Sequence, residues 1–268
     1  MEHLTIDGEK IRSFSQINVR GKEVMEGTYG RLVPDEIYSY FSIDRETFEN
    51  PKGEKVVSIC APTPLSVVIE VRLHPYELDT IFKLHLDTTP NNQIEIVYVS
   101  VSNPFSERFD VDRDESGNPI VFGTSKRNRA EEERAMRAGL APGQVRQGLK
   151  LLSRFLPQAE LFFASMGYMI AVMNPLAYHD AILFEKYGCG YLSGRDFMEN
   201  INDKFSEGGE FCNRLDNSAF RKKGQEKTVR GRSWAIYDGI LGHPFKDIKM
   251  YRQAFQSCEV STFGGVGY

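Results

Sequence analysis

The chain has no hydrophobic stretch of the roughly 18 residues that a membrane-spanning helix needs, and it shows neither internal repeats nor low-complexity tracts. Its beginning, MEHLTIDGEKIRSF, lacks both the basic and the apolar region of a secretory signal peptide. Proline and glycine are spread along the chain and mark no linker. We therefore expect a single domain covering residues 1–268, with no membrane span and a cytoplasmic location.

Cysteine is scarce as well. The four cysteines lie far apart and form no C-x-x-C pair, so they indicate neither a zinc knuckle nor a disulfide framework, and we expect free thiols at Cys60, Cys189, Cys212 and Cys258. The Ser-His-Asp elbow, the Walker loop and the G-x-G-x-x-G loop are also absent. The sequence therefore lacks the motifs of hydrolases, of P-loop NTPases and of dinucleotide-binding enzymes.

An excess of positive charge is missing too. The formal net charge is -4 and the sequence pI is about 5.8. These values argue against general nucleic-acid binding, which depends on neutralising phosphates. Two windows, 126–154 and 214–232, are nevertheless rich in lysine and arginine. A solvated face is the favoured interpretation of both windows, and a site for a phosphate-bearing ligand is the alternative.

Runs rich in valine, isoleucine and tyrosine predict strands in the first half of the chain, at 55–61, 65–73 and 93–102. Between the last two runs, helical spacing of Leu78, Ile81 and Phe82 predicts a short helix or an irregular crossover. A short helix is also expected after Pro34, with acidic residues in its first turn.

The second half alternates between helix and strand. Polar and apolar spacing predicts helices at 125–139, 142–156, 157–167 and 175–188, and strands at 168–174, 189–194 and around 234–237. Val145, Leu149, Leu152 and Leu156 share one face of the second of these helices, and Pro157 would open the third. Helices and strands in this order predict an α/β or α+β fold in which helices cover a sheet.

The stretch AYHDAILFEKYGCGY, from Ala177 to Tyr191, resembles the end of the cofactor-side helix in the GNAT acyltransferase superfamily. The pattern is carried by Ala181, Ile182, Leu183, Phe184, Glu185, Lys186, Gly188 and Cys189. Upstream, LAPGQVRQGLKLL (Leu140 to Leu152) looks like the loop with which that family binds the pyrophosphate of coenzyme A. The resemblance covers residues 93–194 and implies a mixed, mostly antiparallel central sheet flanked by helices.

The resemblance also implies site residues. The coenzyme-binding set is Gly143, Gln144, Val145, Arg146, Gln147, Gly148, Lys150 and Phe184. Such a loop presents backbone N–H groups and a helix N-terminus to the phosphates, and glycine allows a close approach. The family often protonates the departing thiolate with a tyrosine, but Phe184 occupies that position here. The catalytic candidates are therefore Tyr178, His179 and Glu185 on the same helix.

The expected function is acyl-CoA-dependent N-acyl transfer, in which an amine acceptor attacks acetyl-CoA or a longer acyl-CoA directly. We expect no metal, and a homodimer is left open. Residues 1–54 would be an elaboration, 55–194 the GNAT-like core with an insertion at 103–139, and 195–268 an extension. A second hypothesis is a non-catalytic protein of the same fold that binds a ligand or a partner.

A third hypothesis is a metal-dependent enzyme, because His74, His85 and Asp87 supply the ligand types of a mononuclear metal centre. On an extended segment His85 and Asp87 would point the same way. The stretch from Asp110 to Gly117 has the acidic spacing of a calcium loop, but it lacks the glycine and the final glutamate that such a loop requires. It is interpreted as a charged hairpin tip.

Overall fold

The computed structural model describes residues 2–124 and 126–265. Contacts within the chain group it into two compact units, each built from several segments. The first unit contains Met1–Phe105, Gly148–Met173 and Arg252–Gln256, and the second contains Ser106–Gln147, Asn174–Tyr251 and Ser257–Tyr268. The single domain expected from the sequence stays a prediction.

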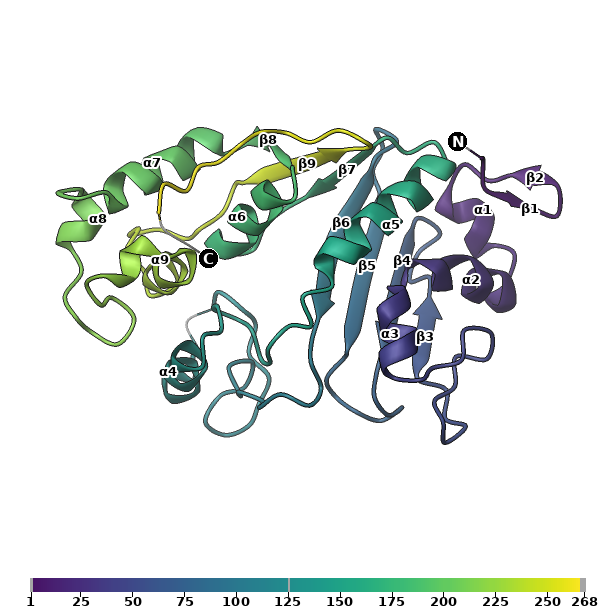
Figure 1. Cartoon of the computed structure of the whole chain (residues 1–268), viewed down its shortest axis with the longest axis horizontal. Helices are drawn as coiled ribbons and strands as arrows, with labels where there is room; N and C mark the ends of the chain where they lie inside the picture. Colours follow the sequence, from purple (N-terminus) through teal and green to yellow (C-terminus); the bar gives the residue numbers. More distant parts are fainter. Residues whose placement is uncertain (1, 125, 266–268) are drawn as a thin grey trace. The chain divides into compact units, whose positions relative to one another are not determined.

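The first unit is built on a sheet whose strands follow the order β3-β4-β5-β6-β7 (Figure 1). Neighbouring strands are antiparallel except β6 and β7, which are parallel. The strands are β3 (Val57–Cys60), β4 (Ser66–Val71), β5 (Phe82–Thr88), β6 (Ile94–Val101) and β7 (Ile170–Met173). A separate pair of short strands, β1 (Thr5–Ile6) and β2 (Glu9–Lys10), precedes them.

Strand β6 has an irregular register with its neighbours. Against β5 it pairs from Ile94 to Ile96 and again from Tyr98 onward, so Val97 is an extra residue without a partner on β5. Its parallel pairing with β7 ends with Ile96 opposite Met173. The bulge and the end of the β7 ladder therefore fall at adjacent residues, and the rest of β6 continues past the last residue of β7.

Helices of the first unit cover one face of this sheet. The buried face carries Val67, Ile69, Leu84 and Leu86, all 0% exposed. Figure 1 shows α3 and α5 lying across the strands, and the ring of Phe155 on α5 packs 5.7 Å from that of Phe82 on β5. The helical segments are α1 (Phe14–Asn18), α2 (Lys22–Tyr29), the 3-10 turn η1 (Gly30–Leu32), α3 (Asp35–Tyr40) and α5 (Leu152–Ser165).

The second unit is mostly helical and includes the antiparallel pair β8–β9. Its elements are α4 (Arg129–Arg137), α6 (Tyr178–Lys186), β8 (Gly190–Ser193), α7 (Arg195–Phe205), α8 (Glu210–Asn213), the 3-10 turn η2 (Gln225–Lys227), α9 (Val229–Tyr237) and β9 (Lys249–Gln253). The last residues of β9, Arg252 and Gln253, belong to the first unit.

Trp234 of α9 lies at the centre of the second unit. It is 1% exposed, its indole N–H donates to the carbonyl of Leu140 at 2.9 Å, and its ring stacks on Phe220 at 5.2 Å. Nearby, the Arg127 guanidinium lies 2.6 Å from Glu132 and 3.1 Å from Asp238. Arg127 belongs to the basic window 126–154. This window is therefore not only a solvated face, because the Arg127 guanidinium pairs with carboxylates inside the unit.

Much of the predicted secondary structure is confirmed. The structure is α+β with a mixed and mostly antiparallel sheet, and strands occupy the runs predicted at 55–61, 65–73, 93–102, 168–174 and 189–194. Helices follow Pro34, end at Gly139 and end at Gly188, where both glycines have positive φ as a helix terminator requires. The acidic stretch that begins at Asp110 forms a turn, in which Asp114 accepts hydrogen bonds from the backbone of Ser116 and Asn118.

Three predicted elements are wrong. The segment around Phe82 is not a helix but β5, because it lies between two strands that satisfy its backbone. The segment around Trp234 is not an edge strand but α9, whose N-cap Thr228 accepts a hydrogen bond from Gly231 N–H at 3.0 Å. Residues 142–151 are not helical, and one helix, α5, runs from Leu152 through Pro157.

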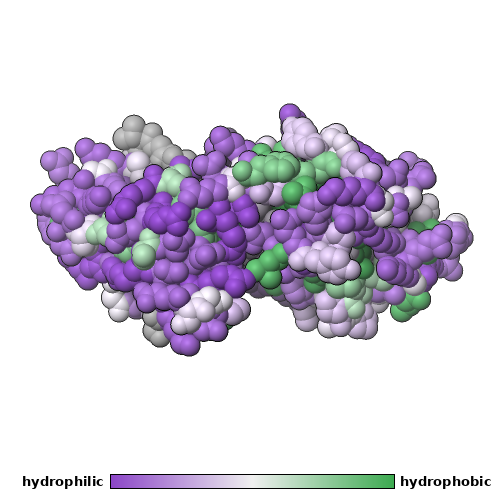
Figure 2. Space-filling model, turned by 90° about the horizontal axis from the view of Figure 1, so that it is seen from below, coloured by the Kyte–Doolittle hydropathy of each residue, from purple (hydrophilic) through white to green (hydrophobic). Residues whose placement is uncertain are grey.

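None of the helices within the described residues combines the length and the apolar character that crossing a membrane would need. On the face shown in Figure 2 the surface is mostly hydrophilic, with apolar residues gathered in a few patches. The exposed large hydrophobic side chains come from many different elements, among them Val19, Leu65, Tyr76, Phe105 and Leu176.

Two helical glycines give a matched test of packing. A Cβ on Gly231 of α9 would overlap the backbone carbonyl of Gln225, whereas a Cβ on Gly27 of α2 meets nothing within 4 Å. We expect Gly231→Ala to lower the free energy of unfolding by about 1–3 kcal/mol through overpacking. Gly27→Ala should raise it by about 0.5–1 kcal/mol, because alanine favours the helix. Urea denaturation measures both, and equal effects would contradict the packing of α9 on η2.

Candidate functional site

Helix α6 carries the predicted catalytic residues, and all of them are buried. Tyr178 is 0% exposed, His179 5% and Glu185 6%. The helix begins after Ala177, whose N–H donates to the Asp180 carboxylate at 3.1 Å, and it packs against α9. The spacing of three and four residues that places Tyr178 and Glu185 on one side therefore points them into the core of the second unit.

Glu185 is held by donors from two other segments. One carboxylate oxygen accepts hydrogen bonds from the Tyr191 hydroxyl at 2.5 Å and the Thr262 hydroxyl at 2.6 Å, and the other accepts from the Thr262 N–H at 3.0 Å. Burial, followed by the hydrogen bond to Glu185, raises the pKa of Tyr191 well above its ordinary value. A buried carboxylate with three donors is a stable structural group that needs no substrate to satisfy it.

Tyr178 lies near the buried guanidinium of Arg232, which is 5% exposed. Arg232 donates to Asn202 Oδ1 at 2.8 Å and stacks over the ring of Phe263 at 4.7 Å. Burial raises the pKa of Tyr178 to about 12, and the positive charge of Arg232 opposes that rise. The phenol is therefore neutral at physiological pH, as a proton donor must be.

His179 is bonded on both sides of its ring. Its Nδ1 lies 2.8 Å from the Ser233 hydroxyl, and its Nε2 lies 3.3 Å from Asp180 Oδ1. Burial lowers the pKa of His179, and Asp180 counteracts this shift. Catalytic roles for these side chains stay predictions, while their burial and bonding give each one a role in the stability of the second unit.

The predicted coenzyme-binding loop is divided between the two units. In the second unit Gly143 packs against the ring of Phe122, and Val145 packs on the cluster of Phe109, Val111, Ala135 and Leu140. The backbone N–H of Gln144 donates to Ala141 at 3.2 Å, and that of Gln147 donates to the Ser106 hydroxyl at 3.2 Å. Arg146 donates to the Ser106 carbonyl, and Phe184 is 9% exposed.

Gly148 and Lys150 belong to the first unit, where they precede α5. A Cβ on Gly148 would come within 3.1 Å of the Val101 carbonyl, so this glycine lies against the end of β6. Lys150 is exposed and has φ of 60°, the left-handed region. The N-terminus of α5 has no side-chain cap and no acidic residue in its first turn. Its positive end is therefore available to an anion.

The resemblance to the acyltransferases implies a splayed strand, but the sequence did not predict that the irregularity lies in β6 at Val97. Val97 and Tyr98 are 42% and 43% exposed, beside Ile94 and Ile96, which are 0% and 6% exposed. The only local signal is the pattern of the run itself, because apolar and polar residues alternate from Ile94 to Ile96 and the alternation ends at Val97. The position of the bulge depends on the partner strands and cannot be read from this run alone.

The residues of the metal hypothesis do not gather into one centre. His74 Nδ1 lies 3.1 Å from Glu54, whereas His85 Nε2 lies 3.4 Å from Asp87 Oδ1 on β5. Within residues 2–124 and 126–265, no group of three or more histidine, cysteine or acidic side chains has the geometry to hold a metal ion. The expectation that His85 and Asp87 share one face of an extended segment agrees with their place on β5.

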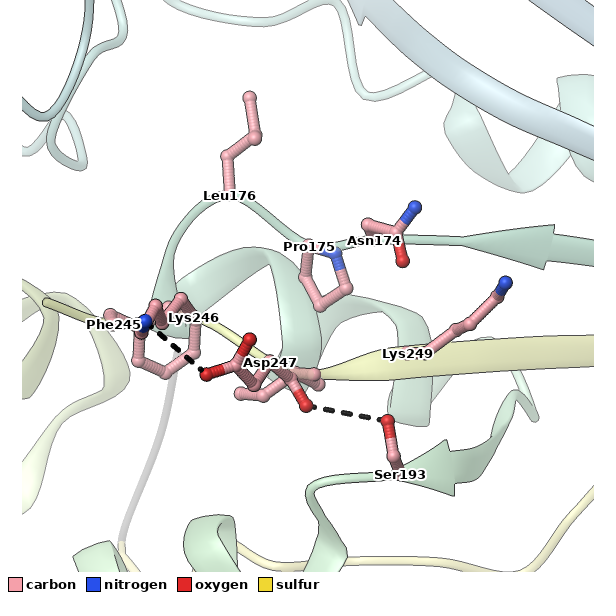
Figure 3. Close-up of a pocket in the computed structure, with 9 residues that line it drawn as sticks. Asn174, Pro175, Leu176, Ser193, Phe245, Lys246, Asp247 and Lys249 are labelled. Carbon is pink, nitrogen blue, oxygen red and sulfur yellow. Dashed lines mark hydrogen bonds and ion pairs between the residues drawn. The ribbon is translucent and has the colours of Figure 1, made fainter.

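A pocket of about 450 Å³ lies in the second unit, at the start of α6 and the start of β9 (Figure 3). The Ser193 hydroxyl donates to the Asp247 carbonyl at 3.3 Å, and Lys246 lies 3.7 Å from the Asp247 carboxylate. Lys249 has no carboxylate partner in the described part of the chain. The remaining lining residues are Asn174, Pro175, Leu176, Phe245 and Ile248. The pocket suits a small ligand with an anionic group.

Comparison with known proteins gives no match: no family model, no curated protein and no solved structure is similar to the chain.

The donors around Glu185 can be tested one at a time. Thr262→Val keeps the shape of the side chain but removes its hydroxyl, and leaves the Tyr191 hydroxyl and one backbone N–H on a buried carboxylate. We expect the free energy of unfolding to fall by about 1.5–3 kcal/mol, because the lost bond is to a charged group. Thr262→Ser retains the hydroxyl and should lose less than half as much. An unchanged free energy of unfolding in Thr262→Val would show that the hydroxyl contributes nothing.

The lowered pKa of His179 makes the free energy of unfolding depend on pH. Since its pKa is lowered in the folded protein, the unfolded chain binds a proton first as the pH falls through about 6.5, the ordinary histidine value. Stability is therefore fully present above that pH and decreases below it, by at most about 1.4 kcal/mol per pH unit. His179→Asn should flatten the pH dependence of the urea midpoint between pH 7 and 5, and an unchanged slope in this variant would contradict the lowered pKa of the buried imidazole.

Proposed function

We propose that the protein is an N-acyltransferase that moves an acyl group from coenzyme A to an amine. The observation that carries this proposal is the arrangement of β6 and β7 in the first unit. These parallel strands pair only from Ile94 to Ile96, and β6 then continues without a β7 partner as far as Val101. An unpaired strand edge inside a sheet is a binding site for an extended ligand that carries amide groups.

The pantetheine arm of coenzyme A is such a ligand, because it is extended and contains two amides. In an antiparallel strand every second residue directs its N–H and C=O toward the same edge. Between Val97 and Val101, the N–H and C=O groups of every second residue face away from β5. There they can bond the amides of the arm and the thioester carbonyl. A backbone N–H on the carbonyl oxygen stabilises the charge that develops there as the amine attacks.

The phosphates of the coenzyme would lie at the start of α5. Gly148 places this segment against Val101, so the N-terminus of α5 follows the same end of β6 from which the unpaired edge extends. The helix terminus and the Lys150 ammonium both attract phosphate. The resemblance of LAPGQVRQGLKLL to a pyrophosphate loop supports the same assignment, with Gly148 and Lys150 as the residues that take part from the first unit.

A protein that binds coenzyme A without turnover is the second candidate. It is favoured by Phe184 at the position of the usual tyrosine and by the burial of Tyr178, His179 and Glu185. The two candidates differ in one measurable respect. An acyltransferase releases a free thiol from acyl-CoA when an amine is present, and a binding protein does not.

Calorimetric titration and thermal shift with coenzyme A, acetyl-CoA and palmitoyl-CoA test the proposal. A ligand that binds only the folded protein raises the melting temperature. We expect binding of all three, and Lys150→Gln should weaken it by about threefold to tenfold through the loss of one phosphate contact. Lys52→Gln removes an exposed lysine of the same unit and should have no effect.

Release of thiol from each acyl-CoA, measured with a panel of primary amines, separates the two candidates. Amine-dependent release supports the acyltransferase, whereas binding without release supports the second candidate. No thermal shift with any of the three ligands at millimolar concentration would rule out both.

A further inference from the structure

The face of the first unit's sheet opposite the buried one carries a group of polar side chains at the bulge. On β5 the residues Leu84 and Leu86 are 0% exposed, while His85 and Asp87, which alternate with them, point to the other face. The β6 residue opposite His85 is Tyr98. Side chains at directly opposite positions have Cβ atoms about 4.5–5.5 Å apart, so Tyr98 and His85 are neighbours on this face.

These side chains are accessible and are not engaged elsewhere. The side chains of His85 and Asp87 are 31% and 41% exposed, and His85 Nε2 lies 3.4 Å from Asp87 Oδ1. Neither His85 Nδ1 nor the Tyr98 hydroxyl has a hydrogen-bond partner in residues 2–124 and 126–265. In contrast, His74 is paired with Glu54, and His179 is buried against Ser233.

The position of this group coincides with the proposed thioester site. Tyr98 directly follows the bulge residue Val97, which itself follows the last residue of β6 that pairs with β7. A ligand lying on the unpaired edge of β6 would therefore present its thioester beside Tyr98, with His85 one strand further across the sheet on the same open face. The acyltransferase candidates Tyr178, His179 and Glu185 do not lie on this strand pair, and His85 and Asp87 were considered only as metal ligands.

We propose that His85 is the general base and Tyr98 the general acid of acyl transfer, with Asp87 orienting the imidazole of His85. The acceptor would be a primary amine that approaches over this open face. The assignment rests on the proposed acyltransferase function and supplies the proton donor that Phe184 cannot provide.

Charge on the same face favours a cationic acceptor. Besides Asp87, the register places Glu95 of β6 opposite Asp87, and Glu70 of β4 opposite Lys83. Lys83 and Arg72 both pair with Glu70, at 2.7 and 2.6 Å. Asp87 therefore provides negative charge next to His85, and the acceptor arrives as an ammonium ion.

The proton balance of the reaction closes with these groups. The ammonium first loses a proton to solvent through His85. The neutral nitrogen then forms a bond to the thioester carbon, the carbon–sulfur bond breaks, and His85 takes the second proton from nitrogen. Tyr98 gives its proton to the departing sulfur and regains one from His85. The products are an amide, a free thiol and one proton in solution.

The test uses the full chain, acyl-CoA that the wild type accepts, and thiol release as the rate measurement. We expect His85→Gln to lower kcat/KM at least 100-fold and Tyr98→Phe to lower kcat at least tenfold, in line with the usual contribution of acid–base catalysis. Coenzyme A binding should stay within about twofold of wild type. His74→Gln, which changes a half-exposed histidine of the same unit, should have wild-type rates.

Further measurements separate chemistry from structure. Asp87→Asn should lower kcat without changing coenzyme A binding. His85→Ala should regain activity with added imidazole, which a purely structural defect would not allow.

The outcomes distinguish this inference from the proposed function. If the wild type turns over and His85→Gln keeps its rate within threefold, the acid–base assignment is wrong and the acyltransferase proposal stands. If the wild type binds coenzyme A but releases no thiol with any amine, or binds none at all, both are overturned.

Discussion

Backbone pairing along β6 is the constraint on which the first unit depends. Every N–H and C=O of a strand within a sheet needs a partner, and β6 meets this requirement toward β5 only by inserting Val97. Toward β7 it meets the requirement for three register pairs and then stops. The unpaired edge of β6 begins where the register changes, and Val97 and Tyr98, which lie at this point, are exposed.

The sequence predicted a helix end correctly where a glycine can adopt the positive φ that the end requires. Gly139 and Gly188 adopt positive φ and end α4 and α6 as expected. Strand β5 and helix α9 show the limit of such signals. The apolar spacing around Phe82 suits a helix, but two flanking strands offer hydrogen bonds that a helix there would leave unmade. In α9, burial of Trp234 against Phe220 and Leu140 decides the conformation, and these partners are distant in sequence.

The candidate site likewise has features that the sequence shows directly and features that depend on contacts between distant residues. The type of each side chain is visible in the sequence, and so is the helix that carries Tyr178 and Glu185. Their burial is not, because it depends on Tyr191 and on Thr262, which lies 77 positions away. His85 and Asp87 were noticed as potential metal ligands, since only their spacing was available. Their relation to Tyr98 arises from the register of β5 with β6, which the sequence does not encode in any local pattern.

Both units are discontinuous in sequence, and this affects how the chain is completed as it is made. The first unit includes Arg252–Gln256, and the second includes the segment from Ser257 onward that supplies Thr262 to Glu185. During synthesis, the first unit is completed only once Arg252–Gln256 has been made, and the buried Glu185 gains its last donors only once Thr262 has been made. Neither unit is one continuous segment of the chain, so cutting the chain at a single position would not separate the two units.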